Sequence, residues 1–244
     1  MNGFRWAAVW LWAFGAFAAA GPACEHRLFE QSAFVVCRYD AGENDIALAL
    51  ADSKGVPLRS FRRLAQQDAA PVRFAMNAGM FQADGRPLGL YVENSKTLKA
   101  LNRAQGTGNF YLEPNGVFAI FGDGTVAIET AAAFAGEKRA PRWATQSGPM
   151  LVIDGALHPQ IAQDGASKYV RNAVGIRDAR TALFVISDAP VSFGRLARFF
   201  RDGLACPNAL YLDGAVSSLW WPEAGRRDNA SPLGPMVVVR DKAD

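Results

Sequence analysis

The chain has 244 residues, is 50% hydrophobic and carries a formal net charge of +3 at pH 7. This length predicts one large domain or two small ones, with a core of ordinary size. So small a surplus of positive charge gives no electrostatic basis for binding nucleic acid. The composition therefore favours a globular protein whose partner is something other than nucleic acid.

The first 20 residues are typical of an export signal. Arg5 supplies the positive start, and an uncharged apolar run from Trp6 ends in small residues at position 20. The run is short for a membrane span, which needs roughly 20 apolar residues, so a retained anchor is the alternative. We expect cleavage after residue 20, or as late as residue 23, and a periplasmic or secreted mature protein. Membrane attachment would occur only through an uncleaved signal, and the sequence leaves the oligomeric state open.

Apolar stretches rich in β-branched and aromatic residues, bounded by Gly, Asp or Asn, predict many short strands. In chain order they are residues 34–39, 46–50, 72–77, 88–93, 110–112, 117–121, 126–129, 149–153, 173–177, 183–187, 209–213 and 236–240. Amphipathic patterns predict two helices, over 58–67 and 193–204. Because no repeat or composition break divides the chain, we expect a single α+β domain with a mixed, twisted β-sheet core and a few flanking helices.

Three cysteines in an exported chain predict one disulfide and one free thiol. Cys24 and Cys37 flank the first predicted strand pair and are the expected disulfide. Cys206 would then be unpaired. It follows a predicted helix and has no histidine near it in the sequence, which favours a buried structural thiol over a nucleophile.

The sequence lacks the residues that several kinds of functional site need. The two histidines, His26 and His158, exclude a multi-histidine zinc site, and a Ser-His-Asp triad would depend on His158 alone. The glycine-rich segment 106–109 has neither the P-loop lysine nor the spacing of a dinucleotide motif. The chemistry that remains is that of carboxylates, amides, hydroxyls and arginine.

Asp213 is the strongest single candidate for that chemistry. It ends an apolar stretch, Gly214 follows it, and the hydroxyls of Ser217 and Ser218 lie within five residues. A carboxylate at the end of a buried strand costs solvation energy unless something pairs with it or uses it. A purely structural role in the turn at Gly214 is the alternative.

A second strand end has the same character. The stretch 74–81 is apolar and ends in the amide of Asn77 and a turn at Gly79. Glycine there allows close approach of the backbone to a ligand, although a turn alone would also explain it. Amides and hydroxyls suit sugar hydroxyls, and the planar fork of Arg171 matches phosphate oxygens, so this set of residues suits a glycosyl phosphate.

Seven segments in register resemble the phosphodiester glycosidase family, the uncovering-enzyme-like proteins, and in particular its exported bacterial branch. They read FAMNAGMF, PLGLYVEN, GNFYLEPNGVFAI, ATQSGPMLVIDG, VRNAVGI, FVISDAPVSF and CPNALYLDGAVSSLW, over roughly residues 30–240. The family's L-D-G-G-G-S signature matches residues 212–217, where Ala215 and Val216 replace two glycines. A segment like the family's N-G-G-F-F signature matches residues 76–81, with alanine in place of the first glycine. A segment like its R-T-A-I-G signature matches residues 171–175, with asparagine in place of threonine.

The resemblance implies a domain over residues 24–244 that hydrolyses the glycosidic bond of a small or polymeric sugar-1-phosphodiester, with cell-envelope glycans as a source. Asp213 would be the nucleophile or base, and Glu93 the second catalytic carboxylate. The implied substrate-binding residues are Asn77, Gly79, Ser147, Arg171, Asn172, Ser217 and Ser218.

Two alternatives stay open beside this interpretation. Glu93 would equally fit an edge-strand carboxylate paired with Lys96 or Lys99. The whole chain would equally fit a non-catalytic carbohydrate- or envelope-binding protein on the same scaffold. No cofactor or metal is required by the sequence, although Asp213 and Asp188 together leave a divalent cation open.

Overall fold

A computed structural model describes residues 21–67 and 70–242 of the chain. The predicted export signal, residues 1–20, lies outside the described residues. Within them, no helix has the length and apolar character needed to cross a membrane.

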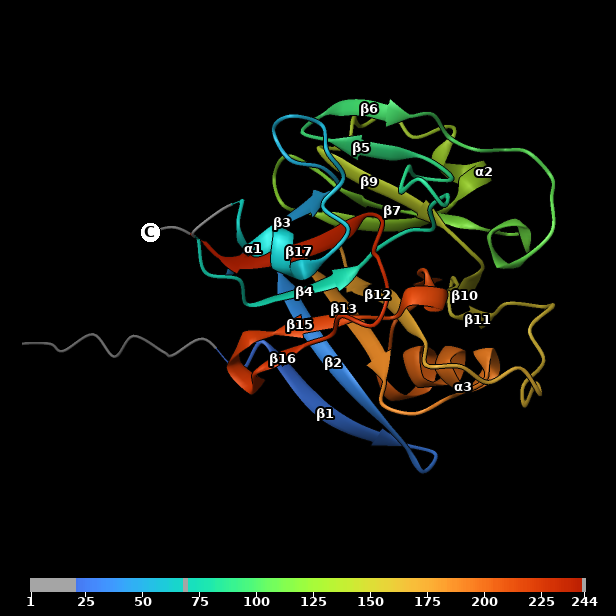
Figure 1. Cartoon of the computed structure of the whole chain (residues 1–244). Helices are drawn as coiled ribbons and strands as arrows, with labels where there is room; N and C mark the ends of the chain where they lie inside the picture. The colour runs from blue at the N-terminus through green and yellow to red at the C-terminus, as the bar shows by residue number, and fades with distance from the viewer. Residues whose placement is uncertain (1–20, 68–69, 243–244) are drawn as a thin grey trace, which may run out of the picture.

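The described residues form three sheets, in which the strand pairs are antiparallel (Figure 1). The first contains, in spatial order, β1 (Cys24–Phe29), β2 (Ser32–Asp40), β13 (Thr181–Ser187), β12 (Asn172–Asp178), β14 (Asn208–Tyr211), β10 (Met150–Ile153) and β11 (Ala156–Leu157). The second contains β16 (Arg226–Arg227), β15 (Leu219–Trp221), β4 (Phe74–Asn77), β17 (Met236–Asp241) and β3 (Asn44–Ala49). The third contains β6 (Lys96–Lys99), β5 (Tyr91–Glu93), β9 (Trp143–Ser147), β7 (Gly116–Ile120) and β8 (Val126–Thr130).

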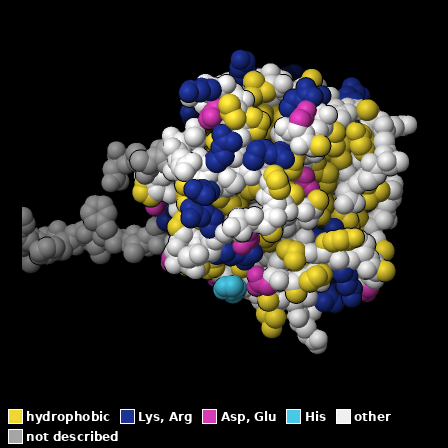
Figure 2. All heavy atoms as spheres, in the orientation of Figure 1, with side chains coloured by type: hydrophobic (Ala, Val, Ile, Leu, Met, Phe, Trp, Pro, Cys, Tyr) yellow, Lys and Arg dark blue, Asp and Glu magenta, His cyan; other side chains and the backbone are white. Residues whose placement is uncertain are grey.

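Helices are few and short, as the sequence predicts for this α+β fold. They are α1 (Phe61–Ala65), α2 (Ala131–Phe134) and α3 (Phe193–Arg198), which continues into a π-helical turn over Phe199–Gly203. Short 3₁₀ turns cover Asn109–Tyr111, Gly214–Val216 and Pro222–Ala224. On the face shown in Figure 2, Lys and Arg side chains lie over α1.

One core joins the three sheets into a single domain. Phe74 of β4, Phe118 of β7 and Phe184 of β13 come from different sheets, and all are buried. The ring centroid of Phe184 lies 5.6 Å from those of both other rings. Burial of aromatic rings is the largest apolar contribution that single side chains make, so this contact anchors the sheets to one another.

Two predicted elements differ from the structure. The strand predicted over residues 110–112 is wrong, because these residues lie at the 3₁₀ turn Asn109–Tyr111. A three-residue apolar run is too short for its periodicity to separate a strand from a helical turn. Helix α1 begins at Phe61 and not at residue 58, because Arg59 has a positive φ of 60° and Ser60 caps the helix.

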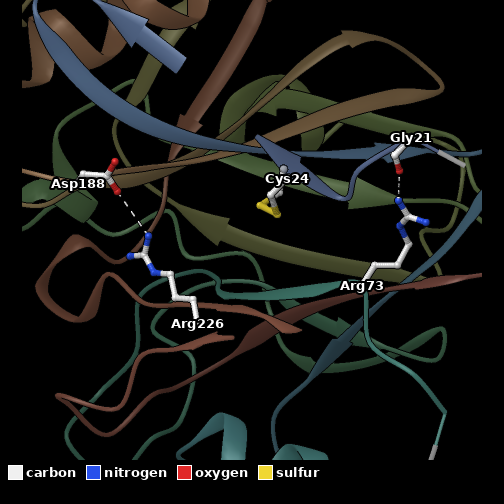
Figure 3. The surroundings of a disulfide bond; sticks show 6 residues. Gly21, Cys24, Arg73, Asp188 and Arg226 are labelled. Carbon is white, nitrogen blue, oxygen red and sulfur yellow. Dashed lines mark hydrogen bonds and ion pairs between the residues drawn. A yellow bond between two sulfur atoms is a disulfide. The ribbon is translucent and has the colours of Figure 1, made fainter. Parts of the chain in front are cut away.

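The amino-terminal edge of the first sheet is tied down covalently. Cys24 and Cys37 are register partners on β1 and β2 and form a disulfide. Near it Arg226 pairs with Asp188 at 3.5 Å, and the guanidinium of Arg73 donates to the Gly21 carbonyl (Figure 3). These contacts hold the edge strand to the body of the domain.

Cys206 is a free, buried thiol after the π-helical turn. Burial raises its pKa to about 12. A thiol that stays protonated is a poor nucleophile, so the structure agrees with the structural role that the sequence favours.

Candidate active site

Four strand ends converge where the first and second sheets meet. Asn77 ends β4, Asn172 begins β12, Asp213 follows β14, and Ser218 precedes β15. The Asp213 N–H donates to the Ala78 carbonyl at 3.0 Å, which joins the two sheets at this point. The sequence-predicted residues of both strand ends therefore lie together.

Buried amide side chains hold the Asp213 loop. Asn77 Nδ2 donates to the Asp213 carbonyl at 2.7 Å, and Asn77 Oδ1 accepts from the Ser218 N–H at 2.8 Å and from Asn172 Nδ2 at 3.0 Å. The Ser217 hydroxyl donates to Asn172 Oδ1 at 3.2 Å. Asn77, Asn172 and Ser218 are at most 2% exposed. These four residues thus position the loop, and their contact with substrate stays a prediction.

The Asp213 carboxylate is only partly exposed, at the start of the 3₁₀ turn Gly214–Val216. Its Oδ1 accepts from the Ala215 N–H at 3.2 Å, and the Phe81 N–H also donates to the carboxylate. Burial raises the pKa of Asp213, and the two N–H groups offset this only in part. An oriented carboxylate with a perturbed pKa is a common feature of catalytic sites.

Gly79 packs against the third sheet, and Ser147 belongs to it. A Cβ at Gly79 would overlap the Thr145 hydroxyl and the Gln146 carbonyl, so glycine is needed there for packing against β9. Ser147 ends β9 and is fully buried, and its hydroxyl has no hydrogen-bond partner among the described residues. Neither observation tests substrate binding, so that role stays a prediction for both.

Arg171 is 1% exposed, and protein acceptors surround its guanidinium. Nε donates to the Val191 carbonyl at 2.9 Å, Nη1 to the Tyr211 hydroxyl at 3.1 Å, and Nη2 to the carbonyl and hydroxyl of Ser167, each at 3.1 Å. The guanidinium also stacks on Phe193, 3.6 Å from the ring centroid. The geometry therefore makes Arg171 a residue that positions its neighbours, and its contact with phosphate stays a prediction.

Glu93 has a hydrogen-bond partner of its own. It ends β5 and accepts a hydrogen bond from the Tyr91 hydroxyl at 2.8 Å. Burial raises its pKa, and the Tyr91 bond opposes that rise. Tyr91 pairs with Thr145, which the Gly79 turn touches, so the register carries Glu93 further from that turn. No contact joins the two carboxylates within the described residues, and the catalytic role of Glu93 stays a prediction.

Tyr211 is a site residue that the sequence analysis missed. Its hydroxyl accepts from Arg171 and lies against Gly214. Burial raises the pKa of Tyr211, while the charge of Arg171 lowers it to a smaller extent. Tyr211 lies two residues before Asp213, and residues two apart along an extended chain share a face. This spacing is the sequence signal that would have identified Tyr211.

A hollow of about 440 Å³ opens beside the Asp213 loop. Its lining consists of Tyr169, Val170, residues 214–218, Ala230 and Ser231, all of which are uncharged. A separate cavity of about 230 Å³, which Asp45, Arg142 and Trp143 help to line, contains none of the predicted site residues. The hollow at the loop is thus the cavity that adjoins the candidate chemistry.

The described residues contain no group of three His, Cys, Asp or Glu side chains placed to hold a metal ion. Asp188, considered with Asp213 for a cation, lies 3.6 Å from His26 Nδ1 and 3.5 Å from Arg226. The carboxylate of Asp188 therefore helps to hold β1 in place.

The candidate site is thus an oriented aspartate among buried amides and hydroxyls, where the first and second antiparallel sheets meet. The chain belongs to the phosphodiester glycosidase family, whose model matches residues 70–240. The predicted resemblance is thereby confirmed.

Among curated proteins, the chain is 40% identical over 171 residues to the uncharacterized protein YigE of Escherichia coli (strain K12). The alignment covers 70% of this chain and 66% of that relative, just under two thirds of its length.

Two solved structures share the fold. The catalytic domain of zebrafish N-acetylglucosamine-1-phosphodiester alpha-N-acetylglucosaminidase, auto-inhibited by its pro-peptide, has a TM-score of 0.63 and 13% identity, covering 92% of this chain and 86% of its own. A hypothetical protein from Synechocystis has a TM-score of 0.52 and 14% identity, covering 90% of this chain and 61% of its own. At these identities, the likeness establishes the fold alone.

Proposed function

We propose that this protein is a hydrolase that cleaves the glycosidic bond of a sugar-1-phosphodiester. Membership of the family supports the reaction class. The observation that carries the proposal is the carboxylate of Asp213, which is half-buried, oriented by the N–H groups of Ala215 and Phe81, and raised in pKa by burial.

In the proposed reaction, ionised Asp213 either attacks the anomeric carbon or takes a proton from the water that attacks it. The bond from that carbon to the phosphate oxygen breaks, and the phosphate monoester leaves with the electron pair. In the first route, water then hydrolyses the glycosyl ester on Asp213. A phosphate monoester has a second pKa of about 6, so it departs as a stable anion with little need for an acid.

A panel of chromogenic sugar-1-phosphodiesters tests the proposal. We expect the wild-type protein to release the chromophore from at least one of them. Asp213→Asn should reduce kcat by roughly 10²–10⁴-fold, the usual contribution of a positioned acid or base, while the thermal melt stays cooperative. Asp241→Asn is the matched control, because Asp241 is 62% exposed and pairs with Arg73 at the far end of β17. Full activity of Asp213→Asn would exclude the assignment to Asp213.

The same panel separates the two function classes that the sequence leaves open. Tight binding of a substrate without release of the chromophore would favour a carbohydrate- or envelope-binding protein on this scaffold. Release of the chromophore by the wild-type protein, lost in Asp213→Asn, favours the hydrolase.

We further propose a periplasmic or secreted location, with cell-envelope glycans as the substrate source. The pattern of residues 1–20 and the Cys24–Cys37 disulfide support it, because disulfides persist in oxidising compartments. Cell fractionation with amino-terminal sequencing is the test. A mature chain that starts between residues 21 and 24 in the periplasm or medium is expected, and an intact chain in the cytosol would contradict the proposal.

A further inference from the structure

We propose that the hollow beside the Asp213 loop, lined by Tyr169, Val170, residues 214–218, Ala230 and Ser231, binds the uncharged sugar, with the ring of Tyr169 as its platform. This inference rests on the proposed function and deepens it, since it says on which side of Asp213 the sugar lies and which side chains select it.

The chemistry of the lining suits a sugar ring. A pyranose presents C–H groups on its faces and hydroxyls around its edge, so it needs an apolar platform beside small polar groups. Tyr169 is a large side chain with 63% exposure, and Ser217 and Ser231 contribute hydroxyls. An exposed aromatic ring at the edge of a hollow gains free energy when a ligand covers it.

The platform is held in place although it is exposed. The backbone N–H and carbonyl of Tyr169 exchange hydrogen bonds with Val191, at 3.3 and 2.8 Å. The guanidinium carbon of Arg171 lies 5.4 Å from the centroid of the Tyr169 ring, within the range of a cation–π contact. A ligand that binds a ring already oriented loses less conformational entropy, which strengthens binding.

Residues 214–218 line the same hollow and provide an acceptor for sugar hydroxyls. The single hydroxyl proton of Ser217 is shared between the Val170 carbonyl at 3.0 Å and Asn172 Oδ1 at 3.2 Å, so the lone pairs of the hydroxyl oxygen are left to accept from a ligand. Beside it, Ala215 and Val216 stand where the family signature has glycines, and both line the hollow. Their side chains narrow the space and would set which sugar substituents fit.

Because the lining of the hollow carries no charge, the hollow suits the sugar half of the substrate and not its phosphate half. None of the residues that line the hollow is Arg, Lys or His. The phosphodiester monoanion gains nothing from such a wall, whereas a neutral sugar loses little solvation there. We therefore expect the phosphate to point away from the hollow, and neutral sugars to bind in preference to uronic acids or sugar phosphates.

The test compares Tyr169→Ala with Tyr169→Phe. We expect Tyr169→Ala to raise KM roughly tenfold with a much smaller change in kcat, and Tyr169→Phe to keep the wild-type KM because it keeps the ring. Leu28→Ala is the matched control, since Leu28 is also a large exposed apolar side chain (76%) but lies on β1. Ala230→Phe, which should fill the hollow from the other side, is expected to raise KM without removing any contact of Tyr169.

Binding in an inactive background separates this inference from the proposed function. Saturation-transfer NMR with free glucose, galactose, N-acetylglucosamine and glucuronic acid, in the Asp213→Asn chain, should show contact for a neutral sugar and its loss in Asp213→Asn/Tyr169→Ala. If Asp213→Asn abolishes turnover but the Tyr169 and Ala230 variants keep wild-type KM and sugar contact, the inference is overturned and the function stands. If Asp213→Asn stays fully active, the proposed function fails first.

Discussion

The hydroxyl of Tyr211 occupies the space that a Cβ on residue 214 would need. The same hydroxyl accepts the Nη1 hydrogen bond of Arg171 at 3.1 Å. Glycine after Asp213 is therefore required by packing against the tyrosine, and one buried contact links the Asp213 loop to the arginine that orients its surroundings.

Gly214→Ala should displace Tyr211 and weaken its bond to Arg171. Overpacking of a filled site destabilises proteins by about 1–3 kcal/mol, and we expect a loss in this range together with reduced turnover. Tyr211→Phe removes the clashing oxygen, so the double variant should be more stable than the sum of the two single changes implies. Urea denaturation of the four chains measures this coupling, and additive effects would show that the two residues do not compete for the same space.

The pH dependence of kcat/KM should report the raised pKa of Asp213. As nucleophile or base, the residue must be ionised, so activity is lost as pH falls through its pKa in the folded enzyme. Because burial raises that pKa, the acid limb should lie above the ordinary aspartate value of about 3.9. An acid limb at or below that value would contradict the environment described for the carboxylate.

The raised pKa of Asp213 should also make the stability of the fold depend on pH. A carboxyl whose pKa is raised in the folded state stabilises the fold below its unfolded pKa and loses that contribution as pH rises through the folded pKa. Asp213→Asn does not titrate, so its melting temperature relative to wild type should be higher at pH 7 than at pH 3. Calorimetry at the two pH values measures the difference, and the opposite order would show that the pKa is lowered.

Arg171→Lys should destabilise the fold even though it keeps the charge. A lysine cannot reproduce the planar set of donors to Val191, Tyr211 and Ser167, and buried acceptors left unpaired cost about 1–3 kcal/mol each. We expect a loss of about 2 kcal/mol or more in the free energy of unfolding. Arg62→Lys on the exposed face of α1 is the control and should be near neutral. A stability equal to wild type, with weaker phosphate binding, would instead support the predicted role of Arg171 as a phosphate ligand.

Glu93→Gln tests the second predicted carboxylate. A catalytic acid contributes roughly 10²–10⁴-fold to the rate, whereas the position of Glu93 beside Tyr91 leads us to expect a change below tenfold. The variant should keep the hydrogen bond from the Tyr91 hydroxyl, because the amide oxygen still accepts. A loss of 10² or more in kcat with a native melt would place Glu93 at the reacting bond after all.

The local features of the chain follow from its sequence. Alternating apolar residues predict most of the core strands, and Gly-Asp-Gly at residues 122–124 predicts the turn between β7 and β8. The position of Asp213 just past a buried strand is also evident from residue order. Short runs such as residues 110–112 and 58–60 are the exceptions, because a left-handed residue or a single helical turn leaves no periodic signal.

The sequence by itself determined the class of fold, the family signatures and the carboxylate most suited to chemistry, because hydrophobic alternation and motif order are local properties of the chain. Only the tertiary structure decided that the strands divide into three sheets, that Asn77 and Asn172 hold the Asp213 loop, that Arg171 is enclosed by aromatic rings and acceptors, and that Glu93 accepts a hydrogen bond from Tyr91. Alternation shows which face of a strand is buried, but not which distant strand covers it. The partners of a buried polar group are set by that long-range pairing.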